Sequence, residues 1–277
     1  MNTFFYWSYL MIEVQQSKKR CLGVLAATLA TCSLVATSLH AGTIPSGAQT
    51  LPIGQSVKLN LLTSGEIPGV VVGDKLFKEF IYSWTNNMPA PENVNVTAII
   101  DSDDNFGIRF QGSFSDLPGD LVASDASLSF SVHVVHEPTN GNSEAENGYG
   151  STRFLISDAH LKSAVFLDEG TPGSFGSVDE SFLGNVPQIP QTLHVFNSTL
   201  GQGGKKSEDG VIFDNTYEWL HVQKDIYAFA AEGANAPVRM TIIDQTFSQV
   251  EIPEPSSATI LMMLGSVAVM GFSRRSL

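Results

Sequence analysis

Short runs in which apolar and polar side chains alternate recur along most of this sequence, and each run is bounded by residues typical of turns. In a clear example, Val94, Val96 and Ala98 are separated by Asn95 and Thr97. Successive side chains of a β-strand point to opposite faces, so this pattern predicts strands with one buried face. Between residues 42 and 252 we find no sustained apolar period of about 3.6 residues, which an amphipathic helix requires. The sequence therefore predicts an all-β fold.

The alternating runs number about ten, as in a β-sandwich or a jelly roll. The predicted strands are residues 56–61, 94–100, 108–114, 127–134, 154–156, 164–167, 175–182, 193–196, 217–229 and 238–247. Residues 76–84 fit either a strand or a helix, and the alternation of their aromatic side chains favours a strand. Residues 138–150 and 200–210 lack apolar periodicity and are predicted to be exposed, mobile loops. Neither an internal repeat nor a shift in composition marks a second domain, so we predict one β-sandwich domain over residues 42–252.

The start of the chain, residues 1–41, has the three parts of a secretory signal peptide. A basic cluster at residues 18–20 precedes an almost wholly apolar or small-residue run, and Ala41 provides the small residue expected before the cleavage site. We predict cleavage after Ala41, with cleavage after Ser38 as the second choice. The aromatic-rich first ten residues do not fit the basic n-region of a signal peptide, which makes Met11 the more natural start.

The composition of the remaining central region limits its stabilisation and its partners. Both cysteines, Cys21 and Cys32, lie in the predicted signal peptide, so residues 42–252 can form no disulfide and must be held together by core packing. Of the 28 acidic residues only Glu13 and Glu254 lie outside this region, whereas five of the 15 basic residues do. The region therefore carries 26 acidic and ten basic side chains, a balance that excludes nucleic acid as a partner and suits divalent cations.

The chain ends with an uncharged apolar segment, residues 258–272, followed by Arg274 and Arg275. As a helix this segment would be about 22 Å long, and the serines that flank it bring it close to the roughly 18 residues that indicate a membrane span. The two arginines favour a cytoplasmic C-terminus and leave the preceding chain outside. A C-terminal core helix of a soluble domain is the other interpretation, but the segment is apolar all round and has no amphipathic face. We therefore predict a transmembrane helix in the inner membrane.

Pro253, Glu254 and Pro255 stand directly before this segment. A Pro-Glu-Pro motif, an apolar segment and a terminal basic pair, in this order, resemble the PEP-CTERM sorting signal of exported bacterial proteins, over residues 253–277. The resemblance implies that an exosortase, an integral-membrane cysteine transpeptidase, recognises the Pro-Glu-Pro motif and cuts near it. It also implies anchoring in the inner membrane before sorting to the cell surface or the extracellular matrix. A weaker resemblance to PEP-CTERM proteins of unassigned function, which supplies no catalytic residues, lies at residues 72–77, 110–112, 222–226 and 243–249.

Asp101, Asp103 and Asn105 alternate in a predicted hairpin loop, as the first ligands of an EF-hand calcium loop do. However, the glycine of this loop comes one position late, and Gly112 stands where a bidentate glutamate is expected. The residues therefore favour a polar turn over a Ca²⁺ site, and no other cofactor is predicted.

No catalytic motif stands out in the sequence: there is no Gly-x-Ser-x-Gly elbow, no phosphate-binding glycine loop and no His-Glu-x-x-His. His133 and His136 are three positions apart, so on a strand they would face opposite ways and share no metal. We expect a non-enzymatic protein with a structural or adhesive role in the exopolysaccharide matrix. The alternative is a carbohydrate-binding module or carbohydrate-active enzyme, in which exposed aromatic residues such as Trp219 would stack on sugar rings.

Overall fold

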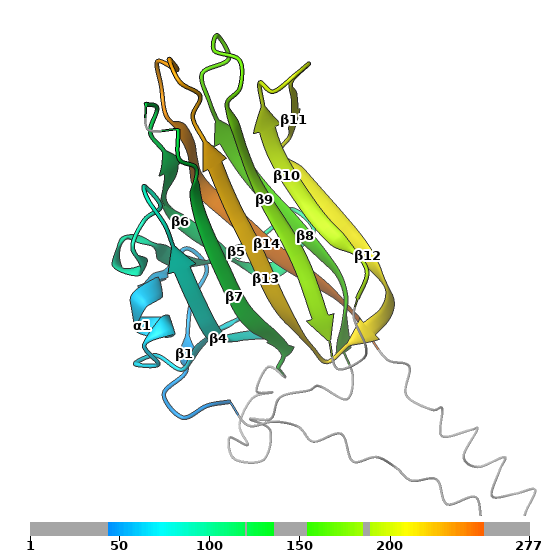
Figure 1. Ribbon diagram of the computed structural model, residues 1–277. Helices are drawn as coiled ribbons and strands as arrows, with labels where there is room; N and C mark the ends of the chain where they lie inside the picture. Colours follow the sequence, from blue (N-terminus) through cyan, green and yellow to red (C-terminus); the bar gives the residue numbers. More distant parts are fainter. Residues whose placement is uncertain (1–43, 120, 136–153, 185–188, 252–277) are drawn as a thin grey trace, which may run out of the picture. The chain divides into compact units, whose positions relative to one another are not determined.

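The computed structural model describes residues 44–119, 121–135, 154–184 and 189–251, which all belong to one compact unit of the chain. They form two β-sheets in two layers (Figure 1). In order across the first sheet, the strands are β1 Gln49–Thr50, β3 Gly69–Val72, β4 Lys75–Trp84, β7 Ser124–Val134, β13 Trp219–Phe229, β9 Phe175–Gly184, β10 Thr192–Ser198 and β11 Gly204–Lys206. In order across the second, they are β12 Glu208–Tyr217, β8 Phe154–Phe166, β14 Val238–Glu251, β6 Phe106–Asp116, β5 Asn95–Ile100 and β2 Ser56–Lys58. The all-β prediction is confirmed.

The core lies between the two sheets and is rich in phenylalanine. Phe130 of β7 lies 5.8 Å from Phe110 of β6 between ring centroids, and Phe77 of β4 lies 6.2 Å from Phe247 of β14. Each of these four rings is fully buried, and each pair joins one sheet to the other. Alternation along the strands explains this arrangement, because every second side chain of an inner face reaches the core. Packing between layers, without a disulfide, therefore holds the described part of the chain together.

The first predicted strand, residues 56–61, is only half correct. β2 ends at Lys58, and the short helix α1, Leu59–Thr63, follows it. Leu59 and Leu62 are both buried, and a spacing of three positions places them on one face of a helix. Over so short a run the apolar residues fit both the two-residue period of a strand and the 3.6-residue period of a helix. The burial of Leu59 and Leu62 against the core favours the helix. A single turn of 3₁₀ helix, η1 Pro91–Asn93, is the other helical element among the described residues.

Two further predictions about secondary structure are wrong. The predicted strands 154–156 and 164–167 are the two ends of one strand, β8, whose middle carries charged side chains on its outer face. The segment 200–210, predicted as a mobile loop, contains β11 and the first residues of β12. In β8 a bulge after Ile156 shifts the alternation, and the inward-facing Ser163 is polar, so the sequence does not show one continuous strand. β11 is exposed throughout and shows no apolar alternation.

Within the described ranges, no helix has both the length and the apolar character needed to cross a membrane. The predicted signal peptide with its cleavage site at Ala41, the predicted transmembrane helix and the second loop, 138–150, lie outside the described residues. The predictions for these segments stay predictions.

Candidate functional site

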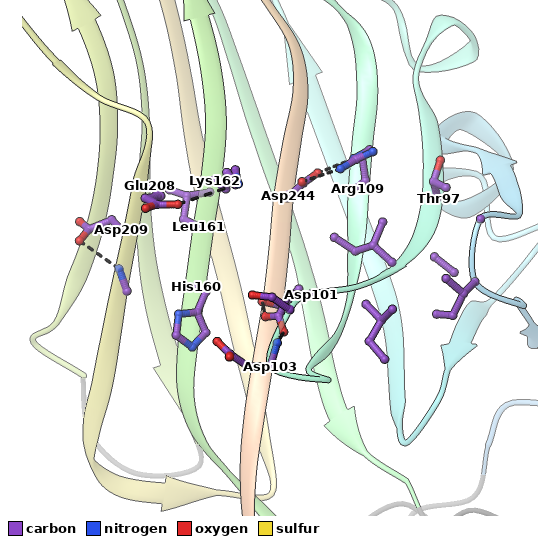
Figure 2. A pocket seen from close by; sticks show the side chains of 18 residues that line it. Thr97, Asp101, Asp103, Arg109, His160, Leu161, Lys162, Glu208, Asp209 and Asp244 are labelled. Carbon is purple, nitrogen blue, oxygen red and sulfur yellow. Dashed lines mark hydrogen bonds and ion pairs between the residues drawn. The ribbon is translucent and has the colours of Figure 1, made fainter.

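A groove of about 810 Å³ lies over the outer face of the six-stranded sheet (Figure 2). Its floor consists of side chains from β5, β6, β14, β8 and β12. The loop before β2, at Ile53 and Gly54, and the turn between β5 and β6 also line it. Ligand-binding pockets have volumes of about 300–1,000 Å³, so the groove has the size of a binding site.

Five side chains form one row across the floor of this groove. Strand pairing places Thr97 of β5 beside Arg109 of β6, and Arg109 beside Asp244 of β14. The row continues with Asp244 beside Lys162 of β8, and with Lys162 beside Glu208 of β12. From Arg109 to Glu208 the charges alternate in sign (Figure 2). Neighbouring strands lie about 4.8 Å apart, so the row extends over about 19 Å.

The middle of the row is held by a bidentate ion pair. Nε of Arg109 donates to Oδ1 of Asp244 at 2.6 Å, and Nη2 donates to Oδ2 at 2.7 Å. These hydrogen bonds raise the pKa of Arg109 above its ordinary value. A guanidinium fixed in this way presents its remaining N–H donors in one direction. The pair therefore forms a preorganised polar surface on the groove floor.

The end of the row at β12 is looser. Nζ of Lys162 lies 3.9 Å from Oε2 of Glu208, and the two side chains are 64% and 75% exposed. Exposed ion pairs of this kind contribute at most about 1 kcal/mol to stability. Both side chains are therefore available to reorganise around a ligand.

A second row lies next to the first and is hollowed by a glycine. Strand pairing places Thr246 of β14 beside His160 of β8, and His160 beside Gly210 of β12. A Cβ atom at Gly210 would lie 2.9 Å from Nδ1 of His160, closer than ordinary contact. Nε2 of His160 lies 3.2 Å from Oδ1 of Asp158. The absence of a side chain at Gly210 keeps the imidazole open to the groove.

The three residues weighed as calcium ligands form the turn at one end of the groove. Oδ1 of Asp101 accepts from the backbone N–H groups of Asp103 and Asn105 at 2.9 and 3.0 Å. Its Oδ2 accepts from the Asn105 amide at 3.1 Å and from the Thr246 hydroxyl at 2.7 Å. Burial alone raises the pKa of Asp101, but these hydrogen bonds outweigh burial and lower it. Asp101 thus fastens the turn to β14, and no group of three or more metal-ligating side chains is present among the described residues.

Trp219, named above for sugar stacking, and the other aromatic side chains that could serve this role do not line the groove. Tyr217 is a core residue with 3% exposure. Trp219 stacks on His133 at 5.9 Å between ring centroids, and Trp84, which is 43% exposed, stacks on Tyr82 at 5.6 Å. Trp219, His133, Trp84 and Tyr82 all belong to strands of the eight-stranded sheet. The groove is therefore polar and aliphatic, and among the described residues that line it His160 has the only ring.

A cluster of carboxylates on the outer face of the eight-stranded sheet escaped the sequence analysis. Asp225 of β13 hydrogen-bonds to Asp125 of β7, and burial together with this neighbour raises the pKa of Asp225 to about 6. Asp179 of β9 stands beside Asp225 in strand register. Its Oδ1 lies 2.6 Å from Nδ1 of His194 on β10. Asp179 is exposed and its neighbour Glu180 is buried, so these two adjacent residues of β9 face opposite sides of the sheet.

Sequence reasoning also missed the charged row in the groove, for a physical reason. Alternation does show that Arg109 and Asp244, which lie in predicted strands, point away from the core. It does not show which strands pair or in which register, and these decide that the residues form one row. The predicted sorting residues Pro253, Glu254, Pro255, Arg274 and Arg275 lie outside the described residues.

No protein-family model and no curated protein matches this chain. Among solved structures, the enzymatically active domain of tailspike protein 4 of bacteriophage CBA120 is 9% identical with a TM-score of 0.25. An arabinose-bound α-L-arabinofuranosidase is 10% identical with a TM-score of 0.18. Each match covers 76% of this chain, and 21% and 31% of the two other chains. The chain therefore spans under a third of either protein, and similarity at this level carries no argument about function.

Proposed function

We propose that this chain is an exported protein of the bacterial cell envelope whose groove binds a neutral polysaccharide. Its role is structural or adhesive within the exopolysaccharide matrix. The observation that supports the binding role is the polar row from Thr97 to Glu208 on the outer face of the six-stranded sheet, in which the charges alternate from Arg109 onward. Export rests on the predicted signal peptide and on the resemblance of residues 253–277 to a PEP-CTERM sorting signal, with an exosortase and the inner membrane as the first partners.

The chemistry of the row suits sugar hydroxyl groups. Each hydroxyl both donates and accepts hydrogen bonds, whereas guanidinium and ammonium groups only donate and carboxylates only accept. A row in which Arg109, Asp244, Lys162 and Glu208 alternate offers donors and acceptors in turn. At about 19 Å the row is long enough for several units of an extended chain, which favours a polymer over a single small molecule.

The charge of the groove favours a neutral glycan over an acidic one. Its charged lining residues are Arg109 and Lys162 on the basic side and Asp101, Asp103, Glu208, Asp209 and Asp244 on the acidic side. Five carboxylates against two cations leave a net charge of −3, with histidine neutral. A polyanionic chain would be repelled from such a surface.

A polysaccharide array probed with the protein in detergent tests this proposal. We expect neutral polymers to be retained and polyanions not to be. The double variant Arg109→Met with Asp244→Asn removes the ion pair without leaving one partner unpaired. It should reduce binding at least tenfold, which corresponds to about 1.4 kcal/mol. Asp225→Asn, on the outer face of the other sheet, is the matched control and should bind like the wild type. Equal binding by wild type and double variant would refute the groove as the site.

The carboxylate cluster supports one alternative, a carbohydrate-active enzyme. Asp225, with its pKa raised to about 6 beside Asp125, has the protonation behaviour of a general acid in glycoside hydrolysis. Release of reducing ends from a retained polysaccharide, lost in Asp225→Asn, would favour the enzyme. Retention without hydrolysis would favour the adhesive role.

A further inference from the structure

Three polar side chains meet in the interior of the sandwich, among the phenylalanine and aliphatic residues of the core. Lys224 of β13 and Gln245 of β14 are 0% exposed, and Glu180 of β9 is 2% exposed. Lys224 and Glu180 are neighbours in strand register within the eight-stranded sheet, whereas Gln245 comes from the six-stranded sheet. The trio therefore bridges the two layers of the fold.

The amine of Lys224 contacts both other groups. Its Nζ forms an ion pair with Oε2 of Glu180 and lies 2.5 Å from Oε1 of Gln245. The nitrogen thus stands against the carboxamide group of one residue and the carboxyl group of the other. A nucleophile, a carbonyl electrophile and a proton carrier are held within contact distance, as an acyl-transfer reaction requires.

The surroundings favour the reactive protonation states. Burial lowers the pKa of Lys224, against the opposing effect of Glu180. Burial likewise raises the pKa of Glu180, against the opposing effect of Lys224. Desolvation thus shifts the pair toward a neutral amine and a neutral carboxylic acid. A neutral amine has the free electron pair that attack on a carbonyl carbon needs.

We propose that Lys224 and Gln245 form an intramolecular isopeptide bond that links the two sheets. Nζ of Lys224 attacks Cδ of Gln245, the new C–N bond forms, and the bond from Cδ to Nε2 breaks. Glu180 transfers a proton from Nζ to the departing Nε2, which leaves as ammonia, so Glu180 is regenerated. No oxidant, reductant or further reactant is needed, and the product is an amide that joins β13 to β14.

The assignment of roles follows from what each group can do. Among the described residues, Gln245 is the carboxamide shown to contact the amine, so it is the electrophile that releases ammonia. If Glu180 were the electrophile instead, the reaction would consume the one carboxyl group shown to contact the amine, and nothing in that contact would remain to transfer the proton. Such a bond has a clear use here, because residues 42–252 contain no cysteine and cannot be cross-linked by disulfides.

Peptide mapping by mass spectrometry of the full chain tests the bond directly. Trypsin cannot cut after an acylated lysine, so digestion with trypsin and a glutamate-specific protease should yield residues 219–232 linked to residues 240–251. The linked species should weigh about 17 Da less than the sum of its parts, the mass of the ammonia lost. Free peptides cut after Lys224, in protein that is folded by circular dichroism, would overturn the proposal.

Three variants separate the roles of the residues. Lys224→Met should abolish the linked species, and Glu180→Gln should abolish it although Lys224 and Gln245 are both retained. Gln245→Glu should restore the same link with loss of water, about 18 Da from the parts. If instead the wild type shows residues 219–232 linked through Glu180, the assignment of Gln245 is overturned. Peptide mapping of the wild type decides whether the bond exists, so the proposal can be refuted even if a variant does not fold.

Discussion

Truncation of Phe130 is the perturbation that tests the packing of the two sheets most sharply. Its ring is fully buried on β7 and lies 5.6 Å from Phe80 of the same sheet and 5.8 Å from Phe110 of the other. Phe130→Ala would remove this apolar surface from the core and leave a cavity between the layers. Truncations of this kind lower the free energy of unfolding by about 3–5 kcal/mol.

The expected effect can be measured by thermal and urea unfolding followed by circular dichroism. In a domain of about 150–250 residues, each 1 kcal/mol lowers Tm by about 2–4 °C, so Phe130→Ala should lower Tm by roughly 6–20 °C. Phe166→Ala is the matched control, since that ring lies on β8 and is 57% exposed. It should change the free energy of unfolding by about 0.5 kcal/mol or less. Similar losses in both variants, or a loss below about 1 kcal/mol in Phe130→Ala, would refute the packing argument.

Three further predictions concern pH, the turn and sorting. The pKa of Asp225 is raised to about 6 in the folded state, above its value of about 3.9 in an unfolded chain. Its protonated form is thus favoured by folding, and stability is lost as the pH rises through about 6. Asp225→Asn should therefore gain stability over wild type at pH 7.5 but not at about pH 3, below the unfolded value of about 3.9, and urea midpoints that differ equally at both pH values would contradict this. Asp101→Ala removes the acceptor for the backbone of the β5–β6 turn and for Thr246, so it should cost about 1–3 kcal/mol in urea unfolding, and no change would show that the turn holds without it. Glu254→Ala should block processing and leave the full-length form in the membrane, as a gel shift against wild type would show, whereas normal maturation would argue against the sorting role of Pro-Glu-Pro.

The fold class can be predicted from this sequence because the alternation of apolar and polar residues along a strand reflects which face of the strand is buried. Alternation over residues 94–100 and 127–134 corresponds to β5 and β7, and the ambiguous residues 76–84 form β4. Prediction from alternation failed in strands where apolar residues do not occupy every second position. In β8 a bulge after Ile156 shifts the alternation and the inward Ser163 is polar, and β11 is exposed throughout, so neither shows a continuous apolar pattern.

The groove and the buried trio could not be predicted from the sequence in the same way. Lys224 and Gln245 occupy inward positions of apolar runs, where a sequence pattern identifies them only as interruptions. The opposition of Lys224 to Glu180 depends on strand register, and that of Lys224 to Gln245 depends on how the two sheets stack. Turn residues and apolar alternation show neither the strand register nor the stacking of the two sheets. The positions of most strands could therefore be predicted from the sequence, whereas the pairing of residues that are distant in the sequence could not.

Binding in the groove is the central claim, and NMR mapping of the backbone amides tests it most directly. A neutral oligosaccharide retained on the array would be titrated into isotope-labelled protein. We predict that the perturbed amides cluster at Thr97, Arg109, His160, Lys162 and Asp244, on the outer face of the six-stranded sheet. Perturbations confined to the eight-stranded sheet around Asp225 and Tyr227, or none at saturating ligand, would contradict the account.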